Sequence, residues 1–143
     1  MTKDLHRARQ LLDSHNLTCA LVLGEQVHTS VHRGVRPLLE LLDSGGDFRG
    51  YSAADKVVGK ATAFLYVLLG VHAVYARTVS RSAAAVLQQY GIALEYGAMV
   101  EAIANRDRTG FCPMESAVRN IDAPQQAHAA VVQTLKKLQA GSP

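Results

Sequence analysis

Residues 71–96 of this chain, VHAVYARTVSRSAAAVLQQYGIALEY, decide its fold class. Residues 71–79 have the β-branched and aromatic character of a strand, residues 82–90 are predicted to be helical, and residues 92–96 again resemble a strand. A strand–helix–strand unit of this kind normally forms two parallel strands joined by a right-handed crossover. The stretch therefore predicts an α/β protein whose sheet is at least partly parallel.

Two short strands and a central helix are predicted ahead of this unit. Residues 17–23 and 27–31 are separated by a glycine-containing turn, which is typical of a β-hairpin. Ser52 followed by Asp55 resembles a capping box, and apolar residues then recur at helical spacing, so a helix is expected over residues 52–68. The sheet is therefore expected to be mixed, with an antiparallel hairpin beside a parallel unit.

The rest of the chain is predicted to be helices joined by loops. A chain of 143 residues has the commonest size of a single domain, so we expect one domain over residues 1–143, with an N-terminal helix within residues 1–16. The further predicted helices span residues 3–14, 37–42, 98–104, 113–119 and 123–138.

Composition excludes several classes of partner. The formal net charge of +3 is small, the basic residues are spread along the chain, and there is no Trp, so we expect no nucleic-acid partner. The sequence has neither a run of about 20 apolar residues nor an apolar leader within its first 16 residues, so no membrane span and no export are expected. Cys19, in a strand-like run, and Cys112 are interpreted as free thiols, and a cytoplasmic location follows.

The first candidate site is the predicted start of the central helix. Asp55 is a candidate catalytic residue there, and Ser52, Lys56 and Lys60 are candidate ligand-binding residues, because a helix start with added lysines attracts anions. The alternative is that Asp55 only caps the helix and that the lysines face water. Gly59 would lie inside this helix, at a cost of about 1 kcal/mol relative to Ala, so another backbone or a ligand is expected to approach it.

The second candidate site is the charged loop before Cys112. Pro113 suits the first turn of a helix, so Cys112 would lie at a helix start, where the dipole and nearby arginines favour the thiolate. Cys112 is therefore a candidate catalytic residue, and we expect it to lie on the same cleft as Asp55. The alternative is a structural cysteine, because no histidine close in sequence can act as its base. Glu115 is expected to interact with the unpaired amides of that helix start. The candidate ligand-binding residues of this region are Asn105, Arg106, Asp107, Arg108, Thr109, Gly110 and Glu115.

No metal or cofactor motif is recognised. His28 and His32 are four residues apart, but they straddle a strand end and a loop, and no carboxylate or cysteine pattern completes a site. Paired-cysteine zinc motifs, phosphate-binding loops and dinucleotide glycine fingerprints are all missing from the sequence. We therefore predict no metal and no cofactor.

Three strings of the sequence resemble a known family. They are RGVRPLLELL (residues 33–42), ADKVVGKA (residues 54–61) and NRDRTGFCPMESAV (residues 105–118). Together they are similar to the bacterial domain-of-unknown-function family eighteen-ninety-three, over a core of about residues 17–138. The resemblance implies a cytidine-deaminase-like, three-layer α/β/α fold.

The resemblance also implies that the zinc chemistry of such folds is lost. Zinc deaminases place a His or Cys and a Glu at one helix start and two Cys at the next. The matching positions would be Ala53 and Asp55 for the first start, and residues 80–85, SRSAAA, for the second. Without these ligands zinc-dependent deamination is not expected. What the resemblance leaves is a pocket suited to a nucleobase or a nucleotide.

Three interpretations of function follow. The leading one is a module that binds a nucleoside- or nucleotide-like small molecule, with Asp55 and the lysines on one wall and the loop before Cys112 on another, where Arg106 or Arg108 would hold a phosphate. The alternative is a group-transfer enzyme in which Asp55 or Cys112 is the nucleophile or the acid/base. The weakest is a structural or interaction protein, and a homo-oligomer is compatible with all three.

Overall fold

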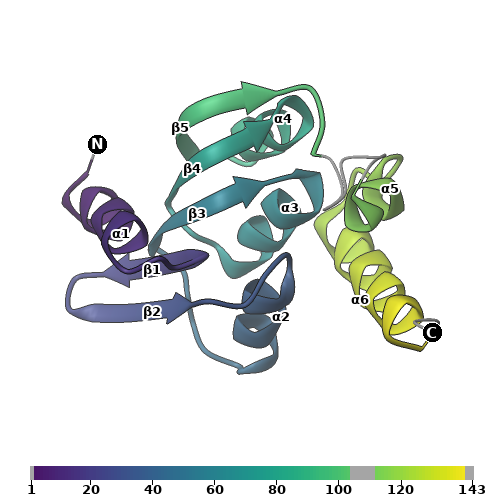
Figure 1. The fold of residues 1–143 in the computed structure, drawn as a ribbon, viewed down its shortest axis with the longest axis horizontal. Coiled ribbons are helices and arrows are strands. Elements are labelled where there is room, and N and C mark those ends of the chain that lie inside the picture. Colours follow the sequence, from purple (N-terminus) through teal and green to yellow (C-terminus); the bar gives the residue numbers. More distant parts are fainter. Residues whose placement is uncertain (1, 104–111, 141–143) are drawn as a thin grey trace.

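The computed structural model describes residues 2–103 and 112–140, which fold around a five-stranded mixed sheet (Figure 1). In the sheet β1 runs antiparallel to both of its neighbours, whereas β3, β4 and β5 are mutually parallel. The predicted hairpin and the predicted parallel strand–helix–strand unit are both confirmed. In spatial order the strands are β2 (Gln26–Ser30), β1 (Cys19–Leu23), β3 (Ser52–Val58), β4 (Ala73–Ser80) and β5 (Ala93–Val100).

Helices cover both faces of this sheet. On one face α1 packs against β1 and β3, with Leu5, Ala8 and Leu12 buried against the sheet. On the other face α3 and α4 lie side by side, and α2 and α6 pack against α3. In the described residues the helices are α1 (Lys3–Ser14), α2 (Arg36–Asp43), α3 (Lys60–Leu69), α4 (Arg81–Gln89), α5 (Pro113–Val118) and α6 (Pro124–Ala140).

The central helix α3 is apolar around most of its circumference because it is covered on several sides. Phe64, Leu65 and Tyr66 are at most 1% exposed. A helix of this kind belongs in the interior of a domain rather than at its surface. Gly70 ends it in the left-handed conformation at φ +78°, as the sequence predicts.

The prediction of a helix over residues 52–68 is wrong in its first part, because residues 52–58 form β3 and the helix begins only at Lys60. Neighbouring residues of β3 are buried on opposite faces of the sheet: Ala53 packs with the cluster that contains α3, and Ala54 with the cluster that contains α1. Burial on both faces of a central strand outweighs the helical preference of alanine and lysine.

A second prediction, that of a helix over residues 98–104, is also wrong, because β5 continues to Val100. Ala98 pairs with Thr78 of β4, and Val100 pairs with Ser80, so pairing with the neighbouring strand extends the edge strand beyond the local preference of its residues.

Among the described residues, no helix combines the length and the apolar character that crossing a membrane requires.

Candidate functional site

A cavity of about 380 Å³ lies beside the carboxyl-terminal half of β3. Its walls come from β1, the β2–α2 loop, β3, the start of α3 and the start of α5, so segments far apart in the sequence meet there. Most of the wall is apolar, with a small number of polar side chains. The lining residues are Thr18, Cys19, Arg33, Gly34, Val35, Pro37, Asp55, Lys56, Val57, Gly59, Ala61, Thr62, Ile103, Cys112, Met114 and Glu115.

Asp55 is the most deeply placed carboxyl group of this cavity, with only 9% of the residue exposed. On β3 it lies opposite Cys19 of the antiparallel strand β1. Its Oδ2 accepts a hydrogen bond from the Tyr66 hydroxyl at 2.7 Å, and its Oδ1 accepts one from the Val57 amide at 3.3 Å. Within the described part of the chain, no basic side chain forms an ion pair with Asp55.

Burial without a cation changes the acidity of this carboxyl group. Removal from water raises the pKa of Asp55 from 3.8 to about 7, although hydrogen bonds from the Tyr66 hydroxyl and from the Val57 and Lys56 amides oppose the shift. Near neutral pH the carboxyl group is therefore present in both protonation states. In such a cavity it can accept a hydrogen bond, donate one or transfer a proton.

The groups around Asp55 keep their protons. Burial, followed by the negative charge of Asp55, raises the pKa of the Cys19 thiol, and the same causes raise the pKa of the Tyr66 hydroxyl. Tyr66 therefore remains a hydrogen-bond donor to Asp55. Cys19 lies in a strand, as the sequence predicts, and is only 2% exposed.

Glu115 of α5 binds the amino end of α3. Its Oε1 accepts a hydrogen bond from the Lys60 amide at 2.8 Å, and its Oε2 accepts one from the Ala61 amide at 2.9 Å. These amides have no partner within their own helix, and the positive end of the helix dipole favours a carboxylate there. The expectation that Glu115 interacts with the start of its own helix is wrong, because it caps a helix that begins 55 residues earlier in the chain.

Gly59 is required by this contact. It is the N-cap of α3 in an extended conformation, and the expectation that it lies inside a helix is wrong. A Cβ atom added at Gly59 would lie 2.5 Å from Cδ of Glu115, much closer than carbon atoms approach without bonding. The protein group that approaches Gly59 most closely is therefore this carboxyl group, and not another backbone.

Cys112 is the N-cap residue of α5 and is partly exposed. Its amide donates a hydrogen bond to the carbonyl oxygen of Ile103 at 3.1 Å, and its carbonyl oxygen accepts one from the Ser116 amide at 3.1 Å. Cys112 and Asp55 line the same cavity, so the predicted shared cleft is confirmed. The reason differs from the predicted one, because Asp55 lies on a strand and not at a helix start.

The structure separates the other residues predicted around Asp55. Lys56 lines the cavity, but its Nζ donates a hydrogen bond to Asn16 Oδ1 at 3.4 Å. The Nζ of Lys60 donates one to the carbonyl oxygen of Arg119 at 3.0 Å, and Lys60 does not line the cavity. The prediction that both lysines add charge to one helix start beside Asp55 is therefore wrong, because Lys56 belongs to β3 and Lys60 begins α3.

Two further groups of predicted residues lie elsewhere. Ser52 is buried at the opposite end of β3, where it pairs with Val22 and Ala73, and it is not part of the cavity. The predicted roles of the charged loop cannot be placed on the structure, because its residues lie outside the described part of the chain: Asn105, Arg106, Asp107, Arg108, Thr109 and Gly110.

Several cavity residues have no signal in the local sequence pattern. Thr18, Cys19 and Arg33 belong to the start of β1 and to the loop after β2, and Thr62 to the first turn of α3. They reach the cavity because β1 pairs with β3, which brings Cys19 opposite Asp55. The hairpin can be predicted from its turn, but the strand that pairs with its other edge cannot, so sequence reasoning missed these residues.

A second cavity of about 210 Å³ adjoins the first, and Cys19 and Pro37 line both. His28 and His32 border it but have separate partners. The His28 ring packs against the rings of Phe48 and Tyr51, with centroids 5.2 and 5.7 Å away, whereas Nδ1 of His32 lies 2.6 Å from Oε1 of Glu40.

The helix starts carry residues that do not suit zinc. The match of Ala53 and Asp55 to the first helix start is wrong, because both lie in β3; the start of α3 reads Gly59-Lys60-Ala61. The start of α4 reads Ser80-Arg81-Ser82, as expected. Among residues 2–103 and 112–140, no group of three or more His, Cys, Asp or Glu side chains is arranged to hold a metal ion.

Comparisons with other proteins agree with the family resemblance. The sequence profile of the family described as Domain of unknown function (DUF1893) matches residues 7–135. A crystal structure of a DUF1893 family protein from Thermotoga maritima superposes with a TM-score of 0.83 at 25% sequence identity, covering 96% of this chain and 92% of that one. No curated protein matches the sequence significantly.

The contact between Gly59 and Glu115 predicts a non-additive pair of substitutions. Gly59→Ala forces the carboxyl group away, and Glu115→Ala removes the cap of α3, so each should lower the free energy of unfolding by about 1–3 kcal/mol. In the double variant the clash is gone. The loss in the free energy of unfolding should therefore be at least about 1 kcal/mol smaller than the sum of the losses in the two single variants. Urea unfolding measures these free energies. Combining Gly59→Ala with Glu101→Ala, an exposed carboxylate paired with Arg81, should instead be additive.

The raised pKa of Asp55 predicts a pH-dependent stability difference. The Asp55 carboxyl group loses its proton near pH 3.8 in the unfolded chain and near pH 7 in the folded protein. Between these pH values the folded state binds more protons. The contribution of Asp55 to the free energy of unfolding therefore falls as the pH rises from 3.8 to 7. Asp55→Asn cannot titrate. Its stability relative to wild type should therefore increase by roughly 2–4 kcal/mol from pH 4.5 to pH 8, as measured by urea unfolding. Asp47→Asn, which alters an exposed carboxylate paired with Arg49, should show no such increase; the same slope in both variants would contradict the assignment.

Proposed function

The chain belongs to the DUF1893 family, and we propose that its cavity binds a small heterocyclic molecule of the nucleoside or nucleobase type, with Asp55 as the polar anchor. The observation that carries the proposal is a buried carboxyl group with a pKa near neutrality on the wall of a 380 Å³ cavity. Ionisable groups that are buried in clefts without a charged partner concentrate at functional sites.

The size and lining of the cavity support this class of ligand. Small-molecule pockets commonly have volumes of about 300–1,000 Å³ and mostly apolar walls with a few polar groups. Val35, Val57 and Met114 offer apolar contacts for a planar ring. Val57 lies in a central strand, yet it is 45% exposed and lines the cavity.

Asp55 suits the hydrogen-bonding edge of a heterocycle. Oδ2 accepts a hydrogen bond from Tyr66 and Oδ1 accepts one from Val57, and the two oxygens of a carboxylate together offer about four lone pairs, so capacity for a ligand remains. Ionised, the group can accept from a ring N–H or an exocyclic amino group; protonated, it can donate to a ring nitrogen or a carbonyl group. Thr62, in the first turn of α3, lines the same cavity.

The start of α3 does not serve as a phosphate site in this proposal. Anion binding at a helix start near Asp55, as the sequence predicts, would need free amides, but the Lys60 and Ala61 amides are occupied by Glu115. The proposed ligand is therefore held through its neutral heterocycle, at Asp55.

We take the scaffold to be of the cytidine-deaminase-like kind, without its chemistry. The element order supports this: a hairpin, then three parallel strands alternating with helices that lie on one face of the sheet. We also place the protein in the cytoplasm, and both cysteines are free thiols, which fits a reducing compartment.

Group transfer is the second candidate, favoured by the presence of Asp55 and Cys112 on one cavity. In that case either side chain would act as a nucleophile and carry a covalent adduct between two steps. Intact mass spectrometry of the purified protein distinguishes the two: an adduct on one of these residues favours the enzyme, whereas a small molecule removed by dialysis favours the binding module.

Ligand binding predicts protection of Cys112. With cytidine as the probe, iodoacetamide should modify Cys112 more slowly than in the free protein, because the nucleoside fills the cavity that Cys112 lines. Cys19 should remain unmodified in the native state, being 2% exposed. Peptide mass spectrometry follows both thiols, and isothermal titration calorimetry measures the affinity.

The matched variants isolate the role of Asp55 in this experiment. Asp55→Asn should weaken cytidine binding by about tenfold or more, because the ionised state that accepts from the amino group is lost. Asp47→Asn, outside the cavity, should bind as wild type. If cytidine, uridine and their free bases neither release heat nor protect Cys112, the proposed function is wrong.

A further inference from the structure

We propose that Arg33 forms an anion-binding subsite at the rim of the cavity, so that the ligand carries a phosphate or carboxylate group beyond the heterocycle at Asp55. This inference rests on the proposed function and names the class of ligand more narrowly. It assigns the recognition of charge to a residue of the β2–α2 loop rather than to the lysines or to a helix start.

Arg33 is the basic side chain of the cavity that is left without a partner in residues 2–103 and 112–140. Its guanidinium group makes no hydrogen bond, ion pair or ring contact there, although the residue is exposed and lines the cavity. Lys56, the other basic residue on the wall, donates to Asn16. The amides at the start of α3 bind Glu115. Arg33 is therefore the cation of the cavity whose donors are all unused within the described residues, whereas Lys56 has already turned one of its donors towards Asn16.

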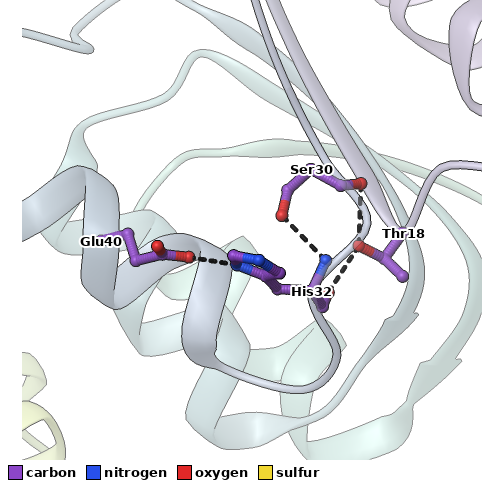
Figure 2. A network of polar contacts seen from close by, with 4 residues as sticks. All are labelled: Thr18, Ser30, His32 and Glu40. Carbon is purple, nitrogen blue, oxygen red and sulfur yellow. Dashed lines mark hydrogen bonds and ion pairs between the residues drawn. The ribbon is translucent and has the colours of Figure 1, made fainter.

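The backbone next to Arg33 is fixed by a network of polar contacts (Figure 2). The Thr18 hydroxyl donates to the carbonyl oxygen of His32 at 2.6 Å, and the amide of His32 donates to the hydroxyl oxygen of Ser30 at 3.0 Å. The His32 ring reaches in the other direction, to Glu40 of α2 at 2.6 Å. His32 is thus held by Thr18 just before β1, by β2 and by α2 together, so the backbone on this side of Arg33 is fixed.

The residues after Arg33 anchor the loop on its other side. Gly34 turns the chain in the left-handed conformation at φ +66°, which a residue with a side chain rarely adopts. Val35 then returns to the core, at 5% exposed, and Pro37 lies in the first turn of α2. Arg33 therefore extends from a backbone that is fixed on both sides, while its side chain remains available to meet a ligand.

The charges of the cavity also favour an anion at this position. Glu115 is compensated by the α3 amides, and Asp55 is only partly ionised near neutral pH because burial raises its pKa to about 7. A guanidinium group offers a planar pair of N–H donors, which matches two oxygens of a phosphate or a carboxylate. Fixed loop geometry reduces the ordering cost of such a contact.

The experiment uses two matched pairs of probes on the full chain. Cytidine and cytidine 5′-monophosphate differ by a phosphate, and uracil and orotate differ by a carboxylate. Calorimetry should show that at least one anionic probe binds about tenfold more tightly than its neutral counterpart, and that this preference shrinks as salt is added. The pair that shows the gain identifies which anion the subsite takes.

Arg33→Gln is the test variant, and Arg36→Gln is its control. Arg36 is exposed at the start of α2 but does not line the cavity, so its substitution removes the same charge nearby without touching the proposed subsite. Arg33→Gln should abolish the preference for the anionic probe and leave the neutral probe's affinity within about twofold of wild type. Arg36→Gln should retain the preference.

The possible results separate this inference from the proposed function. Two results overturn the subsite alone, provided that the neutral probes bind. In the first, Arg33→Gln keeps the full preference for the anionic probe. In the second, the wild-type protein shows no preference for an anionic probe. A preference lost equally in both variants overturns it too, because the effect is then one of net charge. Failure of all four probes to bind wild type overturns both the subsite and the proposed function. Melting temperatures close to wild type show that the variants are folded.

Discussion

The pairing of the Glu115 carboxylate with the amides at the start of α3 is the contact on which the cavity depends. Helix α5 has six residues, too few to be stable without tertiary contacts. The carboxylate joins it to the helix that packs on the centre of the sheet, and Met114 and Val118 bury the adjoining apolar side. The wall that carries Cys112 is also held by the packing of α5 against α6. Gly59 is the steric condition of the contact, because a side chain at that position would occupy the same space.

The wall that α5 adds to the cavity also contributes to the environment of Asp55. The carboxyl group lies between β1, α3 and the cavity, so it loses most of its water but gains no cation in the described part of the chain. Isolation of this kind costs stability, and a protein that only needed a strand at this position could use alanine, as it does at Ala53 and Ala54. Tyr66 offsets part of the cost by donating a hydrogen bond, and its own raised pKa keeps it a donor. Under the proposed function, a bound ligand would offset more of this cost by giving the carboxyl group a further polar partner.

The elements that local patterns determine could be predicted from the sequence, and so could part of the site. The hairpin, the strand and helix of residues 71–90 and the C-terminal helices have clear turns, caps and periodicity. Residues 52–58 mislead because Ser52 and Asp55 imitate a capping box, whereas burial between helices on both faces, which no local pattern contains, imposes a strand. The shared cleft of Asp55 and Cys112 is predictable because strand ends and helix starts gather at one edge of a sheet. The partners of Glu115 and of the two lysines cannot be predicted from the sequence. Each of these contacts joins residues far apart in the chain and depends on the register in which the strands pair.

The helix starts of this fold carry groups that already have partners within the protein. In a zinc deaminase the corresponding helix starts would carry metal ligands. Here the start of α3 offers amides that Glu115 occupies, and the start of α4 offers serine and arginine side chains, of which Arg81 pairs with Glu101. Among the described residues, Asp55 on the strand and Arg33 on the loop both line the cavity without an ion-pair partner. Under the proposed function, a ligand would be recognised by hydrogen bonding at the first and by charge at the second.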